Sequence, residues 1–167
     1  MESMRSVIGF PAVVNEKAAR VVAACVVVVA ATALVTGWLW LSVVLAAGFA
    51  LRVASGPRLD PFGRFATAVV APRLGAPRLV SGAPKRFAQG VGLAFTAAAS
   101  VALLLGAPAV AAVLLAVLVV FASLEAFAGF CAGCFAFGQL IRLGLVSDDT
   151  CVECADISLR RRESATA

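Results

Sequence analysis

Long uncharged apolar segments alternate with short basic segments along this chain. No residue from Val21 to Leu51 carries a charge, and a second uncharged run follows Arg86 and ends at Glu125. A helix needs about 20 apolar residues to cross a bilayer, so each run is long enough for two crossings. The pattern predicts an all-α integral membrane protein with four transmembrane helices, arranged as two hairpins.

Turn signals divide each apolar run into two helices. In the first run, Gly37 is followed by Trp38 and Trp40, and tryptophan prefers the membrane interface. In the second run, Gly106-Ala107-Pro108 predicts a tight turn. We therefore expect helices at residues 18–36, 38–54 and 87–105, and a fourth from 108 to about 131 that ends by Arg142.

The distribution of basic residues predicts the orientation in the membrane. The segment 52–86 carries seven Lys or Arg residues and one acid, Asp60, and short basic loops stay in the cytoplasm. Four crossings place both termini on one side, and both terminal segments are basic as well. We expect a multi-pass cell-membrane protein with a cytoplasmic N-terminus at 1–17, a membrane domain at 18–142 with a cytoplasmic loop at 55–86, and a cytoplasmic tail at 143–167.

Composition supports a membrane location. The chain is 62% hydrophobic, with a mean hydropathy of +1.03, whereas soluble domains are about half apolar. The net charge of +5 lies beside apolar segments, which favours anionic lipid head groups over nucleic acid as the partner. The first apolar run is far longer than the ~7–15 residues of a secretory signal, so we expect no cleavage.

The central loop contains one helix signal. Asp60 precedes Pro61, a capping residue followed by proline at the first helical position. Phe62, Phe65 and Val69 then share one face. Two interpretations stand side by side: a short amphipathic helix in the membrane interface, or a helix packed within the loop without contact with lipid.

Cysteines carry the candidate chemistry. The chain has no histidine and no tyrosine, and four of its five cysteines form two Cys-x-x-Cys pairs, Cys131 with Cys134 and Cys151 with Cys154. A cytoplasmic dithiol rests in the reduced state. One interpretation is thiol–disulfide exchange or sulfur handling at the first pair, with the tail pair relaying electrons from a soluble protein and no cofactor.

A second interpretation joins the two pairs in one metal site. Their spacing, Cys-x2-Cys-x16-Cys-x2-Cys, matches a four-thiolate zinc site. Against it, phenylalanines surround the first pair, and we expect that pair inside the last membrane helix, where a doubly negative zinc site is costly. A third interpretation is a membrane anchor without catalysis, in which Gly129 and Gly133 form a helix-packing motif.

Glu125 is the only acid within an expected span, and ionisable groups there are functional candidates. Gln89, Thr96 and Ser100 form a polar stripe on the third helix. We expect Thr96 or Ser100 to hydrogen-bond to Glu125, which is placed to pass protons during thiol chemistry or to serve as a packing acid. The fifth cysteine, Cys25, is expected in the core.

Three stretches resemble a bacterial four-span membrane family of unknown function: Arg73-Leu74-Gly75-Ala76-Pro77-Arg78, Arg86-Phe87-Ala88-Gln89-Gly90-Val91-Gly92, and Phe127-Ala128-Gly129-Phe130-Cys131-Ala132-Gly133-Cys134. The resemblance covers roughly residues 20–142 and implies a bacterial inner-membrane location. The family often occurs beside thioredoxin-like and sulfurtransferase proteins, which implies a partner of that kind. The tail with Cys151 and Cys154 departs from the family pattern, so a mechanism that uses both pairs does not follow from the resemblance.

Overall fold

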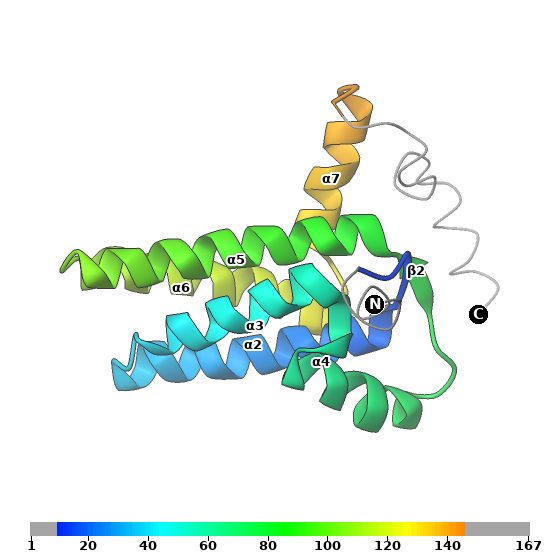
Figure 1. Cartoon of the computed structure of the whole chain (residues 1–167), viewed down its shortest axis with the longest axis horizontal. Helices are drawn as coiled ribbons and strands as arrows, with labels where there is room; N and C mark the ends of the chain where they lie inside the picture. The colour runs from blue at the N-terminus through cyan, green and yellow to red at the C-terminus, as the bar shows by residue number, and fades with distance from the viewer. Residues whose placement is uncertain (1–9, 146–167) are drawn as a thin grey trace, which may run out of the picture.

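A computed structural model describes residues 10–145 of the chain. Four long helices run side by side as a bundle, and a short two-stranded ribbon and several short helices lie at one end (Figure 1). The bundle helices are α2 (Glu16–Thr36), α3 (Leu41–Ser55), α5 (Gly82–Leu104) and α6 (Pro108–Ser123).

The chain folds back at one end of the bundle and carries all its other elements at the opposite end. The turns between α2 and α3 and between α5 and α6 lie together (Figure 1, left). At the other end lie the ribbon of β1 (Val13–Asn15) with β2 (Leu79–Ser81), the helix α4 (Pro61–Phe65), and α7 (Ala132–Arg142). The ribbon is antiparallel and pairs Val13 with Ser81.

Small side chains allow the bundle helices to approach closely. Ala30, Ala33, Ala99 and Ala111 are fully buried in one core with Leu45 and other apolar residues. In lipid, close packing and hydrogen bonds between helices replace the hydrophobic drive of soluble cores. One such bond joins the hydroxyls of Ser42 on α3 and Ser100 on α5, 3.0 Å apart.

Three helical segments are long and apolar enough to cross a membrane: Glu16–Thr36, Gly82–Leu104 and Pro108–Ala128. This supports a membrane protein. The expected second span, residues 38–54, is present as the shorter helix α3 of 15 residues. At 1.5 Å per residue α3 is about 22 Å long, less than the ~30 Å hydrocarbon core.

Two helix boundaries differ from the sequence-based expectation. The third helix begins at Gly82 and not at residue 87; Pro84 is tolerated there because it lies in the first helical turn, where proline removes no hydrogen bond. The fourth helix does not continue to residue 131. After α6, a single π-helical turn, η4 (Leu124–Ala128), ends it.

The central loop is built around a buried ion pair that sequence analysis did not find. Asp60 caps α4 as expected, accepting a hydrogen bond from the backbone N–H of Gly63 at 2.6 Å. The same carboxylate accepts one from Nη1 of Arg52 at 3.0 Å. Both side chains are buried. Arg52 was expected to mark the end of a membrane helix, but it binds the loop back onto the bundle.

Candidate dithiol site

The last membrane helix ends at Ala128, three residues before Cys131. Gly129 adopts a left-handed conformation with φ of 67°, which is accessible to glycine at little cost. Arg20 of α2 donates hydrogen bonds to the freed carbonyl oxygens of Ala126 and Phe127, at 3.2 and 2.9 Å. The chain can therefore leave the bundle without losing hydrogen bonds at the helix end.

Cys131 is the N-cap of a new helix, α7, which leaves the bundle at a steep angle (Figure 1). Its Sγ accepts a hydrogen bond from the backbone N–H of Cys134 at 3.3 Å. The expectation that the pair lies inside the last membrane helix is wrong: Gly129 breaks that helix, and Cys131 caps the next one. Both are free thiols, 8% and 6% exposed.

The two thiols have unlike acidities. The hydrogen bond from the Cys134 thiol lowers the pKa of Cys131, with help from the positive charge of Lys85 and the backbone N–H of Cys134, against burial and the charge of Glu125. Donating that hydrogen bond raises the pKa of Cys134, and burial raises it further. Cys131 is thus the more acidic thiol of the pair.

Close contacts with α5 fix the start of α7. A Cβ at Gly133 would lie 2.7 Å from Cα of Ala88, so only glycine fits between the two helices. One turn further, the rings of Phe137 and Phe87 are 5.6 Å apart, and Phe137 is buried with Ile141. The start of α7, which carries the cysteine pair, is therefore packed closely against α5.

Glu125 hydrogen-bonds to α5, but through a residue that sequence analysis had placed in the loop. Its Oε1 lies 2.6 Å from Nζ of Lys85, and both side chains are largely buried. The expected partners bond elsewhere: Thr96 donates to the carbonyl of Gly92, and Ser100 bonds to Ser42. The helix α5 begins at the end of the bundle where the antiparallel α6 ends. A helix that starts at Gly82 therefore places Lys85 near Glu125, so the correct helix start would have identified this partner.

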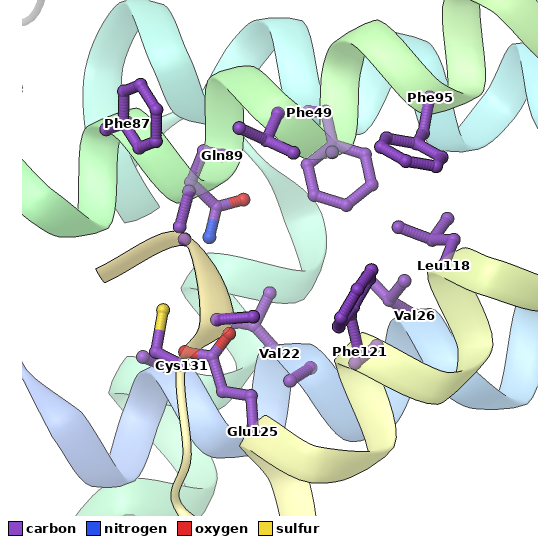
Figure 2. Close-up of a pocket in the computed structure, with 18 of the residues that line it drawn as sticks. Val22, Val26, Phe49, Phe87, Gln89, Phe95, Leu118, Phe121, Glu125 and Cys131 are labelled. Atoms are coloured by element: carbon purple, nitrogen blue, oxygen red, sulfur yellow. The ribbon is translucent and has the colours of Figure 1, made fainter. Parts of the chain in front are cut away.

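A cavity of about 290 Å³ adjoins the pair and is lined by all four bundle helices and the start of α7. Figure 2 shows the rings of Phe49, Phe95 and Phe121 on one side of this cavity, and the Glu125 carboxylate and Cys131 on the other. Cys131 and Glu125 thus share one apolar space. Cys25, by contrast, is half-buried on α2 and does not line it.

The chain matches a known family over most of its length. Residues 14–142 match the family described as Domain of unknown function (DUF4395). The chain belongs to this family. The expected membership of a family of unknown function is confirmed. No curated protein and no solved structure matches the chain.

The family match ends at the last residue of α7 and so contains Cys131 and Cys134. Cys151 and Cys154 follow it and lie outside the described residues, so the four-thiolate zinc site stays a prediction. Within residues 10–145, no group of three or more potential metal ligands is present. The described part of the site is a dithiol with a carboxylate–ammonium pair beside it.

Proposed function

We propose that this protein carries out thiol–disulfide exchange at Cys131 and Cys134. The observation that carries the proposal is the position of Cys131 at the first turn of α7, where its sulfur accepts the Cys134 N–H. Helix N-termini stabilise thiolates, and its raised pKa keeps Cys134 protonated. A pair made of one acidic thiol and one protonated thiol suits exchange through a mixed disulfide.

The exchange has two balanced steps. The Cys131 thiolate attacks a disulfide of a thioredoxin-like or sulfurtransferase partner, forming a mixed disulfide and releasing a partner thiolate. Cys134 then loses its proton and attacks Sγ of Cys131, which forms the internal disulfide and releases the second partner thiol. The reverse sequence oxidises the partner. In this proposal Cys151 and Cys154 add a second route, relaying electrons from a soluble thioredoxin-like partner to the first pair, and Glu125 exchanges protons beside Cys131.

The spacing of the four cysteines favours a zinc site as the second candidate, and metal analysis separates the two. If exchange is the function, the purified full-length protein will contain less than one zinc per chain, and Cys151→Ser will still form the Cys131–Cys134 disulfide with oxidised glutathione. Elemental analysis and a thiol count measure both. One zinc per chain in the wild type, lost in Cys151→Ser, would show the metal site instead, because all four thiolates must then bind one ion.

We also propose the finer membrane arrangement. The helix α3 completes a fourth crossing of a bacterial inner membrane, because it returns the chain from one hairpin turn to the end of the bundle where α5 begins. Local bilayer thinning accommodates its short length. The basic central loop and both termini lie in the cytoplasm. Beside the bundle, the exposed side chains of Phe65 and Val69 enter the lipid interface, at a depth that a spin label at Val69 would measure.

This topology predicts the side from which the cysteines react. In intact cells, a membrane-impermeant maleimide will leave the wild-type protein unlabelled. The same reagent will label the protein after the cells are opened, because every cysteine-bearing segment outside the bundle faces the cytoplasm. Ala107→Cys, in a background with the native cysteines replaced by serine, places a thiol at the opposite hairpin turn and will be labelled in intact cells. Labelling of the wild-type protein in intact cells would contradict the proposed orientation.

A further inference from the structure

We propose that the cavity beside Cys131 binds the ring of a membrane quinone, which accepts two electrons from the Cys131–Cys134 dithiol. This inference rests on the proposed exchange function and names the oxidant for the same site. It follows from three properties of the cavity: its position, its polar end and its size.

The position selects a ligand that arrives from lipid. Most of the cavity wall comes from the three segments that are long and apolar enough to cross a membrane. The rings of Phe49, Phe95 and Phe121 line its apolar side (Figure 2). Aromatic side chains stack on a planar ring, whereas a soluble redox carrier with charged groups would lose its hydration there without compensation.

The polar end presents the groups that quinone reduction needs. Cys131, Glu125 and Gln89 line the same cavity (Figure 2). The Gln89 amide orientation is fixed, because its Oε1 accepts a hydrogen bond from Nε of Arg52 at 2.9 Å and an arginine can only donate. The amide N–H2 therefore remains available to donate to a quinone carbonyl, and among residues 10–145 it has no partner.

The size of the cavity favours one ring over a lipid. At about 290 Å³ it lies at the lower limit of small-molecule sites, which begin at about 300 Å³. That space admits a single substituted ring with its isoprenoid tail left in the membrane. A lipid acyl chain would fill the apolar side equally well, but it would make no use of a thiol, a carboxylate and an amide donor at one end.

The reaction balances between these partners. The Cys131 thiolate adds to a ring carbon of the quinone, and the proton it lost reaches a quinone oxygen by way of Glu125. Cys134 then attacks Sγ of Cys131 and breaks the new C–S bond, whose electron pair stays on the ring, while the Cys134 proton passes to the second oxygen. Two S–H bonds break, one S–S bond forms, and the quinone leaves as a hydroquinone with two electrons and two protons. Cys131, but not Cys134, lines the cavity, which fits this order of attack.

Filling the cavity tests the inference. The full-length protein, with Cys25, Cys151 and Cys154 replaced by serine, is reduced and mixed without oxygen with a short-chain ubiquinone analogue. Hydroquinone is followed by ultraviolet absorbance, and disulfide by thiol alkylation. We expect one hydroquinone per disulfide formed. In parallel, oxidised glutathione replaces the quinone, which measures the thiol chemistry without the cavity.

The decisive quantity is the ratio of the quinone rate to the glutathione rate. Ala122→Phe places a ring in the cavity and will lower this ratio by about tenfold or more, because overpacking excludes the ligand. Ala116→Phe adds the same ring to an exposed position of α6 that does not line the cavity, and will leave the ratio within about twofold.

The outcomes separate the two proposals. Disulfide formation with glutathione but none with the quinone would overturn the quinone inference and leave the exchange function standing. The same conclusion holds if Ala122→Phe and Ala116→Phe give equal ratios, because the quinone would then react without entering the cavity. Failure of the pair to form a disulfide with either oxidant would overturn the exchange function itself.

Discussion

Cys134→Ser will trap a stable mixed disulfide with a thioredoxin-like protein, whereas Cys131→Ser will trap none. The reason lies in the different acidities of the two thiols. The pKa of Cys131 is lowered by the hydrogen bond that Cys134 donates to it, and serine at 134 retains a hydroxyl donor. In Cys134→Ser the nucleophile remains and the group that would resolve the mixed disulfide is gone. Non-reducing electrophoresis after mixing with an oxidised thioredoxin-like protein measures the adduct.

The pH dependence of alkylation gives an independent check. Because its pKa is lowered, Cys131 in Cys134→Ser will reach half its maximal rate at a lower pH than an ordinary exposed thiol does. The remaining thiol in Cys131→Ser is Cys134, which is still buried. At neutral pH it will react at about one tenth of the rate of Cys131 in Cys134→Ser, or more slowly still, since each pKa unit changes the thiolate fraction tenfold. Both variants need Cys25, Cys151 and Cys154 replaced by serine. Equal alkylation profiles would contradict the assignment of Cys131 as the nucleophile.

Arg52→Met will lower the free energy of unfolding by about 3–5 kcal/mol, the cost of leaving one partner of a buried ion pair alone. Its Nη1 lies 3.0 Å from the Asp60 carboxylate, and its guanidinium lies over the Phe49 ring, 4.4 Å from the ring centroid. Removal leaves Asp60 buried without its counter-ion. The midpoint of thermal unfolding in detergent measures the effect.

Two further variants identify the cause of this loss. Adding Asp60→Ser to Arg52→Met removes the unpaired charge while keeping a helix-capping side chain, and will restore part of the stability. Arg78→Met removes a second ion pair, between Arg78 and Glu16 at 3.0 Å, but the Arg78 side chain is 51% exposed and the cost will be less than about 1 kcal/mol. Equal losses in Arg52→Met and Arg78→Met would show that burial of the first pair does not govern its contribution.

The membrane character and the helix order followed from the sequence, because both depend on local signals. An uncharged run from Val21 to Leu51 has few alternatives to membrane-spanning helix, and Gly106-Ala107-Pro108 breaks a helix in any context. The Asp60 cap is likewise local, since it needs only Pro61 and the N–H of Gly63. The choice of Cys131 and Cys134 as candidate residues rested on their spacing and on the absence of histidine.

Contacts between distant segments decided the rest. The end of the last membrane helix depends on Arg20, which lies 106 residues before the carbonyl it binds at Ala126. Nothing near Gly129 in the sequence indicates that contact, so a continuous helix through Cys131 was the natural expectation. The partner of Glu125 was missed for a related reason, because Lys85 reaches it only when α5 begins at Gly82.

Local stretches of sequence were therefore enough to identify the apolar helices, their turns and the candidate residues for chemistry. What surrounds those candidates depends on tertiary packing. Packing made Cys131 the N-cap of a new helix, placed Lys85 beside Glu125, and left an apolar cavity beside Cys131. Acidity and ligand access depend on distances between segments far apart in the chain, and packing sets those distances.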